Sequence, residues 1–254
     1  MDRNTARRVV DVAAAEIERA LATMRISGSP RPYYLSALVR DETSWTIQAK
    51  YGSLCTDVCD RKRNAYVDVR VGSYRNDQVR DGGLDDNDMD AESYGYIDLP
   101  WGSDANGLRH GLWRLIDARY REAVETLFDK KSHELTYRDG NRHLHSFRKA
   151  EPAVDLAWRE LPAVDADHWR GFVERTSRKI KRYVDIADSH VEFQADQLCR
   201  MFTNSEGSRL IECSAIWSLE AYLWLLSSKG DAFPWTVRYT VTDPAELPDE
   251  KTFM

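Results

Sequence analysis

A long alternation of apolar and mixed residues, from residue 202 to residue 226, constrains the fold more than any other part of the sequence. It opens with a turn at residues 204–207, where Asn204 and Gly207 tolerate the positive φ of a tight reversal. One set of alternate positions is apolar: Ile211, Cys213, Ala215, Trp217, Leu219, Ala221, Leu223 and Leu225. The other set is mixed: Glu212, Ser214, Ile216, Ser218, Glu220, Tyr222 and Trp224. Strands usually stop at about 5–6 residues, so we expect one strongly bent strand or two strands meeting at a bulge.

The segments on either side predict a mixture of helices and strands. Apolar residues at helical spacing predict helices over about 4–25, 107–132 and 168–186. Alternating or β-branched segments predict strands over 33–40, 44–51, 65–71, 190–196, 198–203 and 232–242. The short polar links between the strands favour antiparallel neighbours. The order indicates an α+β fold: a curved, largely antiparallel sheet with two or three amphipathic helices packed on one face.

Composition narrows the class of protein. Of 254 residues, 42% are apolar and 31% charged, as in a soluble globular domain, and the net charge of −6 argues against a general nucleic-acid binder. There is no apolar run near the ~20 residues that span a bilayer, and no signal-peptide pattern at the N-terminus. Four cysteines in a chain of this length do not suggest a disulfide scaffold, so we expect a cytoplasmic protein with reduced thiols.

The order of segments resembles a known family. An amphipathic helix is followed by PYYLSALVRDETSWTIQAKYGSL, AYVDVRVGSY, the helical GLWRLIDARYREAVETL, and VEFQADQLCRMFTNSEGSRL. This series is similar to the N-terminal half of the TldD/PmbA family of metallopeptidases, also called peptidase U62 or modulator of DNA gyrase. The resemblance covers nearly all of residues 10–248. Its most specific pieces are DVRVGSY, at 68–74, and TNSEGSR, at 203–209.

The resemblance implies a dimer, formed with a second copy or with a related TldD/PmbA-type subunit. In such proteins the N-terminal domain carries a curved sheet that helps enclose a cavity. A C-terminal domain holds the catalytic zinc on a helix bearing HExxxH, and the substrates are unfolded or small peptides. An extended peptide can add to exposed strand edges in such a cavity.

This sequence departs from the family pattern at the metal site. It has no HExxxH, because its one His-Glu pair, His133-Glu134, is followed by LTYRDG. We therefore expect residues 1–254 to form a single N-terminal domain that lacks the C-terminal zinc domain. We assign it no catalytic and no metal-ligating residue, and the zinc is expected in the missing domain. The chain alone is predicted to be inactive.

Other residues could in principle hold a metal. Cys55 and Cys59, with His143 and His145, offer two thiolates and two imidazoles, but the usual spacing is CxxC, so ordinary thiols and exposed histidines are favoured. The acidic run at 85–90 lacks the Gly and Glu of a calcium loop, which favours a solvated loop.

For two further features of the sequence we predict a structural role and no ligand. The basic residues of the helix near 175–182 favour a solvated face over nucleic-acid binding. Cys199 and Cys213 lie in neighbouring predicted strands and could approach each other, but Cys213 belongs to the apolar set, so we expect it to pack.

The mixed set suggests a peptide-facing surface formed by Glu220, Tyr222, Trp224, Trp235 and Arg238. Aromatic and Arg side chains give a large contact area at low entropic cost. The alternative is that these residues lie under helices in the core, and the sequence does not decide between the two.

The leading hypothesis is an N-terminal, non-metal-binding domain of a TldD/PmbA-like zinc metallopeptidase. It would shape the peptide-binding cavity and support dimerisation. The alternative is a non-catalytic partner subunit that binds peptide or protein, and an independent enzyme using the His143/His145 region is a remote third.

Overall fold

The computed structural model describes residues 1–79, 95–102, 104–136 and 145–253. In chain order the helices are α1 (Arg3–Thr23), α2 (Ala105–Thr136), α3 (Ala166–Ile180) and the short α4 (Glu250–Phe253), with a 3₁₀ turn at Pro244–Glu246. The strands are β1 (Pro32–Lys50), β2 (Ser53–Val71), β3 (Ile97–Asp98), β4 (Val154–Asp155), β5 (Ile186–Asn204), β6 (Arg209–Leu226) and β7 (Ala232–Val241). None of the helices in these ranges is both long and apolar enough to span a membrane.

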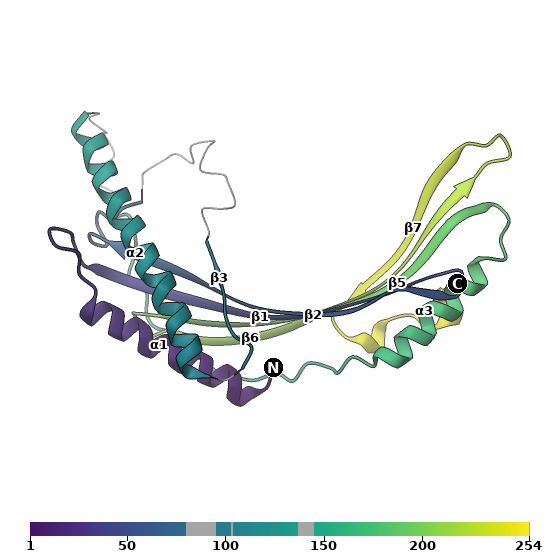
Figure 1. Ribbon diagram of the computed structural model, residues 1–254, viewed down its shortest axis with the longest axis horizontal. Helices are drawn as coiled ribbons and strands as arrows, with labels where there is room; N and C mark the ends of the chain where they lie inside the picture. Colours follow the sequence, from purple (N-terminus) through teal and green to yellow (C-terminus); the bar gives the residue numbers. More distant parts are fainter. Residues whose placement is uncertain (80–94, 103, 137–144, 254) are drawn as a thin grey trace. The chain divides into compact units, whose positions relative to one another are not determined.

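The strands form one seven-stranded sheet in the order β3-β2-β1-β5-β6-β4, with β7 also paired to β6. β2 pairs antiparallel with β3 and β6 with β7, whereas the two-residue β4 runs parallel to β6. Helices pack against this sheet (Figure 1). The α+β fold and the largely antiparallel sheet predicted from the sequence are confirmed.

The chain divides into two compact units that share the four long strands. Unit 1 comprises Met1–Asp41, Lys62–Trp158 and Arg200–Glu212, and unit 2 comprises Glu42–Arg61, Arg159–Cys199 and Cys213–Met254.

In unit 1, α1 and α2 lie against each other (Figure 1). The Asp2 carboxylate caps α1 by accepting hydrogen bonds from the backbone N–H groups of Asn4 and Thr5. The predicted turn is also in this unit. Gly207 has φ of +100°, and the Asn204 side chain accepts from the N–H groups of Glu206 and Ser208, which satisfies the reversal locally.

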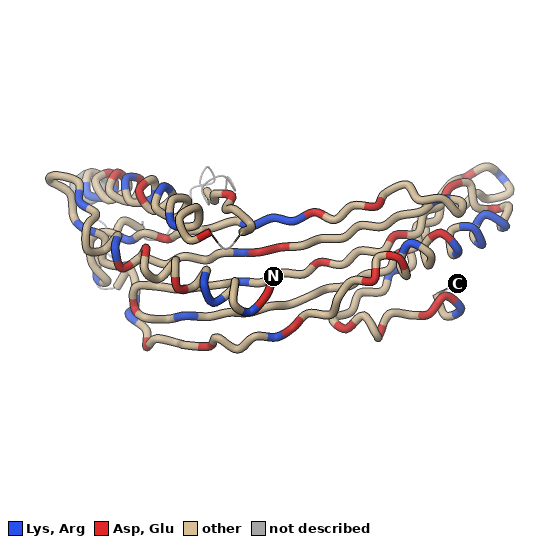
Figure 2. The backbone as a smooth tube through the Cα atoms, turned by 60° about the horizontal axis from the view of Figure 1, so that its bottom comes forward, with Lys and Arg blue, Asp and Glu red and all other residues tan. Residues whose placement is uncertain are grey.

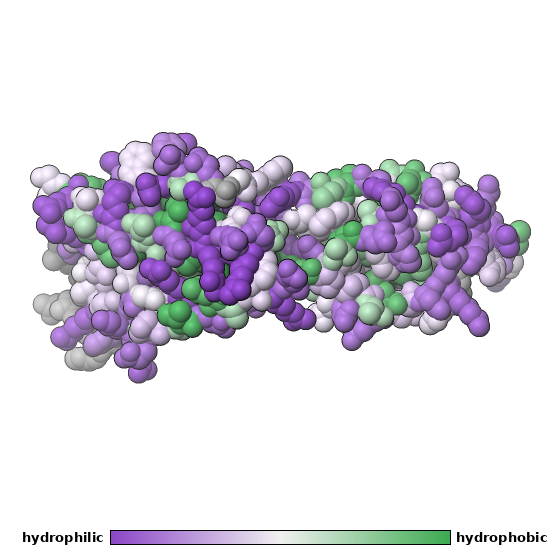
Figure 3. Space-filling view, turned by 90° about the horizontal axis from the view of Figure 1, so that it is seen from below, coloured by the Kyte–Doolittle hydropathy of each residue, from purple (hydrophilic) through white to green (hydrophobic). Residues whose placement is uncertain are grey.

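In unit 2, α3 covers one face of the sheet. Trp169, Phe172 and Val173 of the helix join a buried cluster with apolar side chains of β1, β5, β6 and α4. The strand members are Ile47, Ala49, Val191, Phe193, Ala195, Ala215, Trp217, Leu219 and Ala221, and α4 adds Phe253. Hydrophilic side chains cover the outside of α3 in the space-filling view (Figure 3, right). The helix is therefore amphipathic, as predicted.

Two expected breaks between strands do not exist. Residues 33–40 and 44–50 belong to one strand, β1, and Tyr51 lies in the turn after it. Residues 190–196 and 198–203 belong to β5. Polar residues suggested the breaks, but tertiary partners satisfy them. Asp41 of β1 pairs with Arg63, and the Gln197 side chain of β5 donates to the carbonyl oxygen of Pro162 at 2.7 Å. The long alternating segment likewise forms one strand, β6, which runs from Arg209 to Leu226.

The third helix is shorter than predicted. It ends at Ile180 rather than at residue 186, and Ile186 is the first residue of β5. The N–H of Leu226 donates to the Asp185 carbonyl at 2.8 Å, which ties this connection to the end of β6.

Candidate functional site

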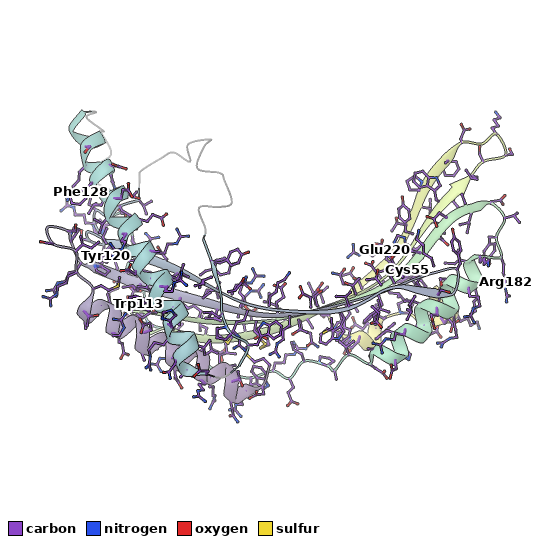
Figure 4. All side chains as sticks on the ribbon, in the orientation of Figure 1. Cys55, Trp113, Tyr120, Phe128, Arg182 and Glu220 are labelled. Atoms are coloured by element: carbon purple, nitrogen blue, oxygen red, sulfur yellow. A yellow bond between two sulfur atoms is a disulfide. The ribbon has the colours of Figure 1, made fainter. Side chains whose placement is uncertain are left out.

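The two faces of β6 have different environments, and this decides where the mixed residues lie. Ala215, Trp217 and Leu219 are buried in the cluster under α3, with Trp217 only 1% exposed. Successive side chains of a strand point to opposite faces, so Glu220, Tyr222 and Trp224 lie on the other face. Their side chains are half-buried or exposed, and Figure 4 shows Glu220 on the side of the sheet away from α3. We call this side of unit 2 the open face.

The ladder between β6 and β7 separates the other two predicted residues. Arg238 lies opposite Glu220, with Nη1 3.6 Å from Oε2, so it belongs to the open face. Trp235 lies opposite Leu223, which places it on the face that α3 covers, although it is 60% exposed. The structure therefore brings four of the five predicted residues together on the open face and places Trp235 on the opposite face.

Aromatic rings form a row across the open face. The ring of His190, on β5, stacks on Tyr222 with centroids 5.3 Å apart, and Tyr222 stacks on Trp224 at 6.4 Å. His190 was not among the residues predicted for this surface from the sequence. The alternation of β5, where Val191 and Phe193 are buried, is the signal that could have placed it here.

Polar contacts between β1 and β5 fix the rest of the face. Lys50 Nζ lies 2.8 Å from an Asp188 oxygen, and the Tyr51 hydroxyl donates to the same carboxylate at 2.7 Å. The hydrogen bond from Lys50, which has the larger effect, and the one from Tyr51 lower the pKa of Asp188 from 3.8 to about 2. Further along, Gln48 donates to Glu192 at 3.0 Å.

The carboxylate of Asp196 continues this row. It accepts hydrogen bonds from the Ser44 hydroxyl and from the Gln194 amide. Neutral groups therefore hold Asp196, whereas a lysine holds Asp188.

Unit 1 contains a separate cavity of about 490 Å³, which the sequence analysis did not predict. It is lined by α2 and by the strands β1, β2 and β5, including Leu38, Tyr66 and Phe202. Its two guanidiniums are already paired. Arg70 contacts Asp68 and Asp77 and lies 4.1 Å from the ring centroid of Phe147, and Arg119 contacts Glu122.

The residues considered for a metal are not brought together as a site. Cys55 and Cys59 are exposed free cysteines, and His143 and the acidic run at 85–90 lie outside the described residues. In the ranges that the structure describes, no three His, Cys, Asp or Glu residues gather closely enough to hold a metal ion.

Several of the basic residues of α3 have structural roles. Arg175 and Lys179 form ion pairs with Glu250 of α4, and Arg178 donates to the carbonyl of Gly52. Figure 2 shows the basic residues along this helix, and Figure 4 places Arg182 after its last turn.

Cys199 and Cys213 form a disulfide in unit 2, with Cα atoms 4.1 Å apart. The expectations that the thiols are reduced and that Cys213 only packs are therefore wrong for this pair. The reason is the register: residues directly opposite each other in antiparallel strands approach to ~4.5 Å at non-hydrogen-bonded positions.

No protein-family model matches the sequence, and no curated protein matches it. Among solved structures, a proposed modulator of DNA gyrase from Bacteroides thetaiotaomicron matches with a TM-score of 0.55 and 10% identity, over 96% of this chain and 47% of that one. A proposed modulator of a DNA gyrase from Thermotoga maritima matches with a TM-score of 0.49 and 9% identity, over 87% of this chain and 42% of the other. TldE from Thermococcus kodakarensis matches with a TM-score of 0.45 and 9% identity, over 87% of this chain and 42% of that one.

This chain thus spans less than half the length of each of these proteins. At 10% identity, the similarity to the Bacteroides protein is evidence of a shared fold. The resemblance to the TldD/PmbA family seen in the sequence is thereby confirmed at the level of the fold, over one part of such a protein.

Proposed function

We propose that this chain is the peptide-binding, non-metal-binding part of a TldD/PmbA-like assembly. It shapes the cavity in which an extended peptide lies and supports dimerisation, with a second copy or a related subunit. The zinc and the peptide-bond chemistry belong to a further domain or subunit. The same surface would serve a non-catalytic partner subunit, which is the alternative form of this proposal.

The open face of unit 2 is the observation that carries the proposal. It is a sheet face on which the described helices do not pack, and it carries the aromatic row of His190, Tyr222 and Trp224. Aromatic side chains with few rotatable bonds are the typical anchors of protein and peptide interfaces.

The edge of the sheet supports the same proposal. Among the described strands, β7 pairs with β6 alone, so its outer edge presents unpaired backbone groups. Such an edge can accept an extended peptide as an additional strand. Pro234 interrupts the donor pattern of this edge, so strand addition is expected mainly along residues 235–241.

Binding of a fluorescently labelled unstructured peptide, followed by anisotropy, tests the proposal. Tyr222→Ala and Trp224→Ala are each expected to weaken binding about tenfold, which is the loss of one aromatic anchor. Trp113→Ala is the control, because Trp113 is an exposed aromatic residue of α2 in unit 1, outside the open face and the β7 edge. Equal affinities for all four proteins would contradict a peptide site on the open face.

A further inference from the structure

Glu192 and Glu220 lie directly opposite each other on β5 and β6. The disulfide sets Cys199 opposite Cys213, and the stacked rings set His190 opposite Tyr222. Each strand advances by the same number of residues between these two contacts, so no bulge intervenes. Counting along the ladder from either contact places Glu192 against Glu220.

Two like charges directly opposite each other in a sheet destabilise it. The neighbours only partly offset this cost. Glu192 accepts one hydrogen bond from the neutral Gln48, and Glu220 lies 3.6 Å from Arg238, whose side chain is half exposed. A local conflict of this kind, in the middle of an open face, is typical of a functional position.

On β5, β6 and β7 the charged side chains of the open face are mostly acidic. They are the carboxylates of Asp188, Glu192, Asp196 and Glu220 and the guanidinium of Arg238, and Lys50 of β1 pairs with Asp188. The lysine already neutralises Asp188, so Glu192 and Asp196 remain with neutral donors only among their hydrogen-bond partners.

We infer that the open face binds extended peptides that carry Lys or Arg, with a basic side chain held between Glu192 and Glu220. This inference rests on the proposed function and specifies its substrate class. Glu192 and Asp196 are four residues apart on one strand, about 13 Å. A second basic residue four positions along an extended peptide reaches Asp196. The ring of Tyr222, beside Glu220, offers the basic side chain a cation–π partner.

Peptides of about 12 residues test the inference against the full chain. They share a Ser/Thr/Gly background and differ at two positions four residues apart, which are Arg in one peptide, Gln in the second and Glu in the third. The wild-type chain is compared with the double variant E192Q/E220Q and with the control variant E212Q. Glu212 lies on β6, as Glu220 does, and pairs with Arg200. Affinities are measured at low and high salt, and melting temperatures by circular dichroism.

We expect the Arg peptide to bind at least about fivefold more tightly than the Gln peptide, and the preference to shrink at high salt. E192Q/E220Q should lose most of the preference, retaining only the part that Asp196 supplies, and keep its affinity for the Gln peptide. E212Q should behave as wild type. The double variant should also melt about 1–3 °C higher, because the like-charge pair is gone.

Equal binding of the three peptides would overturn the charge preference and leave the proposed function standing. A double variant that melts well below wild type would also overturn it, because the carboxylates would then be structural. If none of the peptides binds, the proposed function fails together with this inference.

Discussion

Arg63 and Asp41 form an ion pair inside unit 1 in which the two side chains are only 0% and 2% exposed. The guanidinium lies 2.7 and 2.8 Å from one carboxylate oxygen, and it also donates to the carbonyl oxygens of Pro100 and Gly102. One side chain thus ties β1 and β2 to the segment that precedes α2.

Arg63→Ala is expected to lower the free energy of unfolding by about 3 kcal/mol, because it removes the guanidinium from a buried carboxylate and leaves two carbonyls without this donor. Urea denaturation measures the change. Arg121→Ala is the control: its pair with Asp117 lies on the exposed surface of α2 and should be worth less than about 0.5 kcal/mol. Similar losses in both variants would contradict the central role given to Arg63.

The disulfide gives a prediction about thiol reactivity. Iodoacetamide should modify Cys55 and Cys59 in the native chain, and all four cysteines only after reduction and unfolding, as counted by mass spectrometry. Replacing Cys199 and Cys213 by Ala should destabilise the chain by about 2–3 kcal/mol, because the bond closes a loop of 14 residues. Four modified cysteines in unfolded but unreduced protein would show that the bond is absent.

The lowered pKa of Asp188 makes part of the stability depend on pH. Folding lowers this pKa from 3.8 to about 2, so its pairing with Lys50 stabilises the fold above pH 4 and is lost as the pH falls through about 2. The Asp188 side chain is 51% exposed, so the contribution should be below about 1 kcal/mol. In urea denaturation, Asp188→Asn should be less stable than wild type at neutral pH, and the difference should close towards pH 2. A difference that is constant over this range would refute the assignment.

The sequence predicts the alternation of strands well but not their ends. Asp41 and Gln197 look like interruptions, because a polar residue at a core-facing position normally ends a strand. Their partners, Arg63 and Pro162, are far away in the sequence. Only the folded chain shows that these polar groups are satisfied and that β1 and β5 continue through them.

Only part of the candidate site could be predicted from the sequence, again because the rest depends on tertiary packing. Alternation groups Glu220, Tyr222 and Trp224 on one face, but which face α3 covers depends on packing that no local pattern encodes. The position of Trp235 depends on the turn between β6 and β7, where Leu226 pairs with Ala232. A register differing by one residue would have put Trp235 on the open face.

Because the proposed function assigns the zinc chemistry to another domain or subunit, we predict that the chain alone does not hydrolyse peptides. Unfolded peptide incubated with the purified chain, with and without added zinc, should remain intact by mass spectrometry. Cleavage that a chelator abolishes would contradict the proposal that the metal chemistry belongs to another domain or subunit.

The most direct test of the account is a map of where a bound peptide lies on the chain. A peptide carrying a photo-reactive residue in the middle of its sequence is bound, cross-linked and located by mass spectrometry. We predict cross-links to the open face of unit 2, at positions such as His190, Glu192, Glu220 and Tyr222. Cross-links confined to α3, or to the cavity of unit 1, would contradict it.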